Sequence, residues 1–208
     1  MKKVLIVDDH PVIRAAVKII LKQENVNVIY EASNGVDAVQ IVREHLPDLV
    51  ILDLVMPGLD GLDVLARIKA AHVNVRTLVF TSQDPSFYLN RCMRAGALAY
   101  VAKVNHLQEL QKAIHAVMSG YTYYPRLPAS SVSLDSLQRN ERQMIDKLSD
   151  RELTIFLCLA QGMSNKEIAA TMMLSHKTVS TYKTRLIEKL NVPSAVCLRE
   201  LAKRNHLI

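Results

Sequence analysis

The sequence has no apolar run long enough to cross a membrane, and it holds only three cysteines among 208 residues. A transmembrane helix needs about 20 consecutive apolar residues, so a membrane span is not expected. The N-terminal apolar run ends at Asp8 and Asp9, which argues against a signal peptide. The cysteines are odd in number and widely spaced, and the seven histidines show no H-x-x-x-H spacing. We therefore expect reduced thiols in a cytoplasmic protein, without a disulfide or zinc framework.

The net charge of +6 is unevenly distributed along the chain. Residues 1–122 carry 13 Lys and Arg against 12 Asp and Glu, whereas residues 123–208 carry 13 against 8. A basic second part favours a polyanion as its partner, although charge alone does not identify nucleic acid. The chain is also long enough for two small domains.

Short apolar runs alternate with amphipathic segments as far as residue 118. A parallel sheet needs helical crossovers between its strands, so this alternation predicts an α/β fold with a doubly wound, five-stranded parallel sheet. Strands are expected at residues 4–7, 26–32, 49–52, 77–81 and 98–101, and helices at about 11–20, 36–45, 62–71, 87–94 and 107–118.

The pattern changes after Gly120, where prolines, serines and mixed charges appear. We expect a first domain at 1–122, a linker at 123–147 whose later part is compatible with a helix, and a second domain at 148–208. The second domain shows only helical periodicity, in pieces at about 150–161, 165–173, 176–190 and 194–204. It is therefore predicted to be small and all-α.

The stretch from Asp48 to Gly61, D-L-V-I-L-D-L-V-M-P-G-L-D-G, contains a buried-type strand that ends in a carboxylate, Asp53. Two interpretations are equally compatible with this stretch alone. Asp53 either ends a strand or caps the next segment, or it lies in a ligand site at the carboxyl edge of the sheet.

The other strand ends favour a site. Parallel strands end at one edge, which brings Asp8, Asp9, Asp53, Thr81 and Lys103 together. Three crowded carboxylates repel one another, and a hard cation such as Mg²⁺, which prefers oxygen ligands, offsets that charge. A lysine and a hydroxyl beside them suit the oxygens of a phosphoryl group.

These residues resemble the receiver domain of response regulators, a flavodoxin-like fold. The resemblance implies that Asp53 is the phosphoacceptor, a carboxylate nucleophile that takes phosphoryl from a sensor histidine kinase or a phosphotransfer protein. It also implies that Thr81 and Lys103 hold the phosphoryl oxygens and that Tyr100 is an aromatic switch that turns inward. The motifs that carry the resemblance are V-D-D-H at 7–10, the stretch at 48–61, Thr81-Ser82 and A-Y-V-A-K at 99–103.

The same resemblance assigns the cation. Asp9, Asp53 and the backbone carbonyl of Val55 would bind Mg²⁺ directly, and Asp8 would act mainly through water. In receivers, the positions of Val55 and Gln83 influence how water attacks the phosphoaspartate. An aliphatic Val55 cannot orient water, so we expect slow self-dephosphorylation.

The helical part shows the layout of a helix-turn-helix. Ser164 and Glu167 form a predicted capping box, and the helix at 176–190 has one apolar stripe and one polar, cationic face. A solvated surface helix would show the same face. A DNA-reading second helix after a tight turn is the functional alternative.

Three motifs favour DNA reading: L-S-D-R-E-L at 148–153, A-Q-G-M-S-N-K-E-I-A at 160–169 and S-H-K-T-V-S at 175–180. They resemble the LuxR-type module, and the whole chain is similar to NarL/FixJ-family response regulators of the BvgA/EvgA type. The resemblance implies a homodimer when the protein is phosphorylated, with double-stranded promoter DNA as a partner and RNA polymerase as a further candidate partner. It also implies a regulator rather than an enzyme. It makes Ser180, Thr181 and Thr184 the base-reading candidates and Lys166, Lys177, Lys183 and Arg185 the phosphate contacts.

Two other classes of protein stay open. One is a phosphatase with Asp53 as nucleophile, although the chain lacks a D-x-D signature and the helical domain would have no role in it. The other is an adaptor that works through protein contacts alone.

Overall fold

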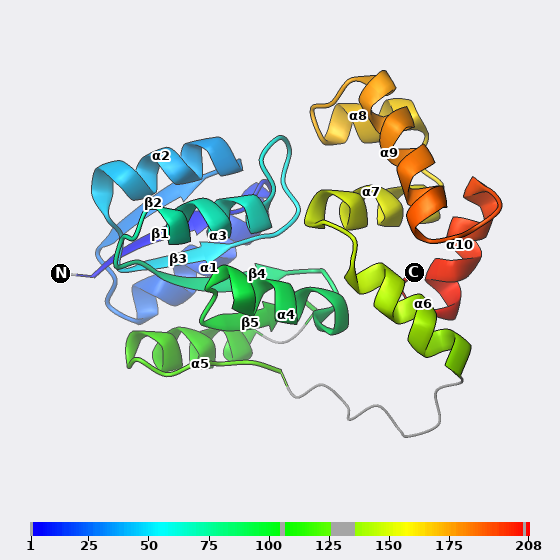
Figure 1. The fold of residues 1–208 in the computed structure, drawn as a ribbon. Coiled ribbons are helices and arrows are strands. Elements are labelled where there is room, and N and C mark those ends of the chain that lie inside the picture. Colours follow the sequence, from blue (N-terminus) through cyan, green and yellow to red (C-terminus); the bar gives the residue numbers. More distant parts are fainter. Residues whose placement is uncertain (1, 105–106, 126–135, 206) are drawn as a thin grey trace. The chain divides into compact units, whose positions relative to one another are not determined.

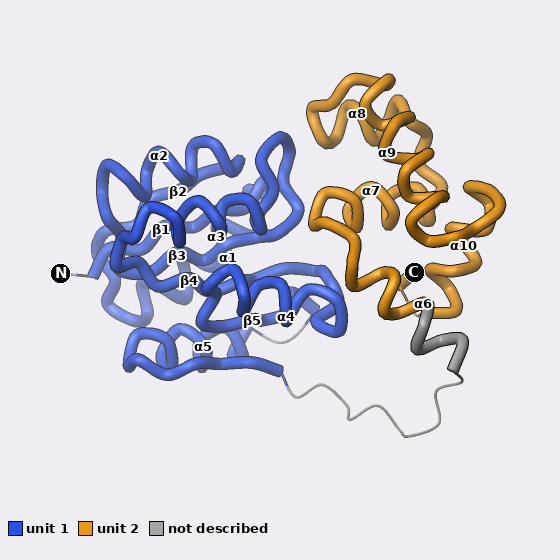
Figure 2. The backbone as a smooth tube through the Cα atoms, in the orientation of Figure 1, with its two compact units in different colours: residues 1–127 blue, residues 128–208 orange. Residues whose placement is uncertain are grey.

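A computed structural model describes residues 2–104, 107–125, 136–205 and 207–208 of the chain (Figure 1). The chain divides into two compact units, residues 1–127 and residues 128–208 (Figure 2). None of the helices in the described ranges is long and apolar enough to span a membrane.

The first unit contains a five-stranded sheet in the order β2-β1-β3-β4-β5, and every neighbouring pair of strands is parallel. This confirms the predicted doubly wound sheet. Val7 at the end of β1 lies beside Leu52 at the end of β3, so these carboxyl ends are aligned. The strands are β1 (Lys3–Val7), β2 (Val28–Ala32), β3 (Leu49–Leu52), β4 (Arg76–Thr81) and β5 (Ala99–Ala102).

Five helices cover the two faces of the sheet. Helices α1 (Pro11–Gln23) and α5 (Leu107–Met118) pack against one face and share its apolar core. Helices α2 (Gly35–His45), α3 (Gly61–Ala70) and α4 (Pro85–Ala95) lie side by side on the other face (Figure 1). The expected elements are all present, with their ends shifted by a few residues.

A close approach at Gly61 fixes the start of α3 against the end of β3. A Cβ atom at this position would lie 2.3 Å from the carbonyl oxygen of Asp53, far inside van der Waals contact. The backbone N–H of Gly61 also donates to the carbonyl of Leu54 at 2.9 Å. Any larger residue at position 61 would therefore push on the backbone that carries Asp53.

The first unit continues beyond residue 122. Tyr123 forms a parallel bridge with Ala99, and its N–H and C=O bond the backbone of Leu98 and Tyr100 at 3.0 and 2.9 Å. The hydroxyl of Tyr124 donates to the carbonyl of Ala97 at 2.7 Å. The expected linker at 123–147 thus begins with residues that belong to the edge of β5.

The second unit contains α6 (Ser136–Asp146), α7 (Asp150–Ala160), α8 (Asn165–Thr171), α9 (His176–Lys189) and α10 (Ala195–Arg204). The last four match the expected helical pieces and confirm the all-α prediction. Helix α6 lies inside the expected linker, yet it packs into this unit. Glu141 of α6 accepts hydrogen bonds from Arg204 and Asn205 at 2.8 and 2.9 Å, and Ile145 is fully buried. The linker is therefore shorter at both ends than expected.

An ion pair joins the start of α7 to the end of α9. Glu152 forms a capping box with Ser149 and also accepts from Lys189 Nζ at 2.7 and 2.9 Å. Burial raises the pKa of the Glu152 carboxyl, but Lys189 and Ser149 outweigh it and leave that pKa below its usual value. The contact supports the helix that carries the predicted DNA-reading residues.

Candidate functional site: an acidic pocket and a helix-turn-helix face

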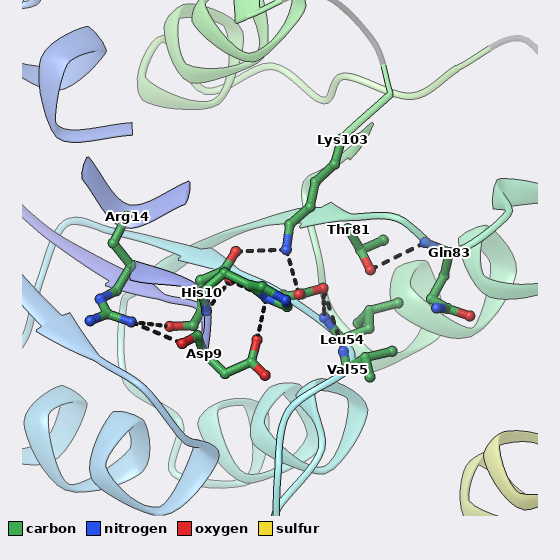
Figure 3. A network of polar contacts seen from close by, with 10 residues as sticks. Asp9, His10, Arg14, Leu54, Val55, Thr81, Gln83 and Lys103 are labelled. Carbon is green, nitrogen blue, oxygen red and sulfur yellow. Dashed lines mark hydrogen bonds and ion pairs between the residues drawn. The ribbon is translucent and has the colours of Figure 1, made fainter. Parts of the chain in front are cut away.

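The carboxyl edge of the sheet brings together the polar residues that the sequence predicts there (Figure 3). The backbone N–H of Asp53 donates to the carbonyl of Val7 at 2.9 Å, which ties the end of β3 to the end of β1. On the other side, the N–H of Lys103 donates to the carbonyl of Thr81 at 2.7 Å. Backbone pairing of the strands therefore places these side chains at one edge.

Lys103 lies between two buried carboxylates. Its Nζ is 2.5 Å from Asp53 Oδ2 and 2.7 Å from Asp8 Oδ2, and the three side chains are 8, 5 and 3% exposed. Burial alone would lower the pKa of this lysine, but its bonds to Asp53 and Asp8 raise the pKa above its usual value. The lysine is charged at neutral pH and offsets part of the repulsion between the two aspartates.

The acidic cluster has the donor chemistry of a divalent-cation site. Ligand atoms of Asp8, Asp9, His10 and Asp53 all lie within 4.8 Å of one another. Asp9 Oδ1 is buried and makes no hydrogen bond within the described part of the chain. His10 Nδ1 lies 2.6 Å from it, a pairing that is ionic only when the imidazole is protonated. Three carboxylates that converge in this way fit Mg²⁺, which prefers oxygen ligands and would offset their charge.

The Asp53 side chain is held in one orientation. Its Oδ1 accepts hydrogen bonds from the backbone N–H groups of Leu54 at 2.7 Å and Val55 at 3.4 Å, while Lys103 holds Oδ2. The side chain of Val55 is exposed beside it. A carboxylate fixed at both oxygens is presented in a defined direction, which favours attack on an incoming group.

Thr81 and Tyr100 are both buried next to this pocket. The hydroxyl of Thr81 accepts from the N–H of Gln83 at 3.4 Å, and the hydroxyl of Tyr100 donates to the carbonyl of Gln83 at 2.7 Å. Burial raises the pKa of Tyr100, which therefore stays protonated. In this structure the tyrosine side chain already lies inward, and Gln83 links it to Thr81.

The predicted DNA-reading residues lie on α8 and α9. Val179 and Leu186 of α9 are buried, and the capping box of Ser164 and Glu167 starts α8 as the sequence indicates. Lys183 is half-buried, whereas Lys166, Lys177, Ser180, Thr181, Thr184 and Arg185 are exposed.

The threonine hydroxyls of this face have their protons engaged within α9. Thr181 Oγ1 donates to the carbonyl of Lys177 at 3.0 Å, and Thr184 Oγ1 donates to the carbonyl of Ser180 at 3.3 Å. Each hydroxyl oxygen keeps lone pairs for an outside donor. The exposed face therefore offers acceptors to an amino group of a base.

A groove of about 540 Å³ lies beside α9 and carries further positive charge. Lys166, His176, Lys183 and Arg199 line it together with Met163 and other residues. The sequence analysis did not single out His176, although it lies in the S-H-K-T-V-S motif. It also missed Arg199, because Arg199 belongs to α10, outside the helix-turn-helix motif. It also missed His10, whose signal was its place in the V-D-D-H motif.

Two family models match the chain. The model of the response regulator receiver domain matches residues 4–115, and that of the luxR family of bacterial regulatory proteins matches residues 146–202. The first covers the sheet and its acidic edge, and the second covers α7 to α9 and most of α10.

Curated relatives match along almost the whole chain. The virulence factors putative positive transcription regulator BvgA of Bordetella pertussis is 50% identical over 205 residues, covering 99% of this chain and 98% of BvgA. The DNA-binding transcriptional activator EvgA of Escherichia coli K12 is 35% identical over 204 residues, covering 98% of each chain.

Solved structures of the response regulator RcsB are similar to this one. RcsB of Salmonella typhimurium matches with a TM-score of 0.70 at 25% identity, covering 99% of both chains. RcsB of Salmonella enterica serovar Typhimurium, bound to promoter P1flhDC in the presence of the phosphomimetic BeF3-, matches with a TM-score of 0.56 at 25% identity, covering 96% of this chain and 97% of RcsB. A structure of two RcsB dimers on two parallel DNAs has a TM-score of 0.56 at 26% identity, covering 97% of this chain and 98% of RcsB.

Proposed function

The chain belongs to the response regulators of two-component systems that carry a luxR-type DNA-binding domain, and we propose that phosphorylation of Asp53 controls its binding to promoter DNA. The observation that carries the proposal is the position of Asp53. Its carboxylate is buried, oriented by two backbone N–H groups and paired with Lys103, beside an acidic cluster.

The proposed reaction is transfer of a phosphoryl group from the phosphohistidine of a sensor kinase or a phosphotransfer protein. An oxygen of Asp53 forms the new O–P bond while the N–P bond breaks and the imidazole leaves. Lys103 and Thr81 are the groups of this chain that would hold phosphoryl oxygens, the first by charge and the second by its hydroxyl. The direct bond from Lys103 to Asp53 and the position of Thr81 at the end of β4 support these roles.

Mg²⁺ would be held by Asp9, Asp53 and the carbonyl of Val55, with Asp8 acting through water, and it would neutralise charge on the phosphoryl oxygens. The convergence of these carboxylates, and the buried Oδ1 of Asp9 that makes no hydrogen bond in the described part of the chain, support this assignment.

Thr81 and Tyr100, both buried, would transmit the change at Asp53 to the surface of the domain. Gln83 bonds both side chains, so a shift of Thr81 toward a phosphoryl group moves the segment against which Tyr100 is held. Such a rearrangement at α4 and β5 would favour a homodimer on paired half-sites, or free the DNA-binding domain. The similarity to RcsB, which is bound to DNA as dimers in one solved structure, supports the first outcome.

On DNA, Ser180, Thr181 and Thr184 would contact base edges, while the cations at 166, 177, 183 and 185 would contact phosphates. Binding to a labelled promoter fragment is expected to weaken steeply with salt, by about a thousandfold or more between 50 and 200 mM for six phosphate contacts. Footprinting with and without a phosphodonor shows which DNA sequence the protein protects and whether phosphorylation changes that protection. Absence of any protected sequence would favour an adaptor, and steady release of phosphate from a small ester would favour a phosphatase.

Val55 is expected to prolong the lifetime of the phosphoryl group on Asp53. The side chain of Val55 is exposed beside Asp53 and cannot hydrogen-bond water. Val55→Asn supplies an amide that orients water for attack, so the half-life of the phosphorylated protein should shorten several-fold. The decay of the phosphorylated fraction on phosphate-affinity gels measures this, and an unchanged half-life would contradict the role of Val55.

A further inference from the structure

Arg14 of α1 hydrogen-bonds the backbone of Asp8 and Asp9, which we call the acidic loop, and is not itself part of the carboxylate cluster (Figure 3). Its Nη1 donates to the carbonyl of Asp8 at 2.8 Å and to the carbonyl of Asp9 at 3.4 Å. These two carbonyls belong to the residues whose carboxylates converge on Asp53. Arg14 therefore contacts the loop that presents the ligand atoms, without contacting a ligand atom itself.

The guanidinium is itself held in place by β2. Its Nε donates to Glu31 Oε2 at 3.3 Å, and Lys18 Nζ lies 2.6 Å from the other oxygen of Glu31. The Arg14 side chain is only 18% exposed. Lys18, and to a smaller extent Arg14, hold the pKa of the Glu31 carboxyl below its usual value. The planar fork of arginine can bond the carbonyls and the carboxylate at once, which a lysine cannot do.

We propose that Arg14 is a positioning residue for the divalent cation, fixing the Asp8–Asp9 backbone so that both carboxylates face Asp53. This inference rests on the cation site of the proposed function. Outer residues that orient metal ligands commonly change metal affinity by about 10- to 100-fold when they are lost.

The sign of the effect separates this role from simple electrostatics. Arg14 carries positive charge close to a cation site, so its charge alone weakens cation binding. If charge were all that mattered, removing Arg14 would strengthen Mg²⁺ binding. A positioning role requires the opposite, because the freed loop no longer gathers its carboxylates.

Two matched variants of the full-length chain test the proposal: Arg14→Met and Lys18→Met. Each substitution removes one positive charge and one partner of Glu31, and methionine keeps an unbranched apolar stem in its place. Of the two residues, Arg14 contacts the acidic loop and Lys18 does not. Calorimetric titration with Mg²⁺ should show a dissociation constant raised about tenfold or more in Arg14→Met and nearly unchanged in Lys18→Met. Arg14→Lys should recover part of the loss.

The rate of labelling by a small phosphodonor gives a second measure. In Arg14→Met the Mg²⁺ concentration for half-maximal rate should rise, while the rate at saturating Mg²⁺ should stay close to that of the unaltered protein. A variant that melts earlier yet binds Mg²⁺ as before, or one that binds it more tightly, would overturn the proposal. Failure of the unaltered protein to bind Mg²⁺ would instead contradict the proposed cation site.

Discussion

Asp53→Ala is expected to abolish phosphoryl labelling and, with it, any gain in promoter affinity caused by a phosphodonor. The substitution removes the carboxylate that we assign as nucleophile, and no neighbouring group replaces it in the same position. Asp8 pairs with the same lysine, but it lies at the end of a different strand. Labelling with radioactive phosphodonor and DNA binding with and without that donor measure the two effects.

The folded state should survive this change. Lys103 keeps Asp8 as its partner, so the variant leaves one buried ion pair instead of an unpaired charge. Asp37→Ala is a matched control, because Asp37 is an exposed aspartate on α2 that bonds Asn34 at the start of its own helix, away from the acidic pocket. A donor-dependent gain in DNA affinity that persists in Asp53→Ala would show that phosphorylation of Asp53 is not the switch.

The convergence of the pocket was predictable because it depends on strand direction. Each of Asp8, Asp53, Thr81 and Lys103 stands at or just after the end of an apolar run, and parallel pairing aligns those ends. Their contacts then follow from backbone geometry. The parallel sheet and the two-unit division follow in the same way from the alternating pattern and its end after Gly120.

Features that depend on side-chain reach, or on contacts too short to leave a sequence pattern, were not predictable. Arg14 lies in the first turn of α1, five residues after Asp9, and nothing in the sequence shows that its guanidinium turns back to the carbonyls of Asp8 and Asp9. Tyr123 extends the edge of β5 by a single bridge, which is too short to give an alternating pattern. The polar helix α6 resembles a linker by composition, whereas its contacts, among them those of Glu141 and the buried Ile145, join it to the second unit.

Lys103→Met should both weaken the response to phosphorylation and destabilise the first unit. The lysine pairs with two buried carboxylates, so its removal leaves Asp8 and Asp53 facing each other without their shared cation. Losing one partner of such a group typically costs about 3 kcal/mol or more in free energy of unfolding. Chemical denaturation measures this, and Lys112→Met is the control, because Lys112 pairs with Glu109 at the surface.

Mg²⁺ and pH sharpen this prediction. If the carboxylates form a cation site, added Mg²⁺ should stabilise Lys103→Met more than the unaltered protein, since it supplies the missing positive charge.

The raised pKa of Lys103 means that its pairing contributes fully below the unfolded lysine value of about 10.4 and is lost as pH rises through the higher folded pKa. The unaltered protein should therefore lose stability more steeply than Lys103→Met above about pH 10, and parallel curves would contradict a charged, paired Lys103.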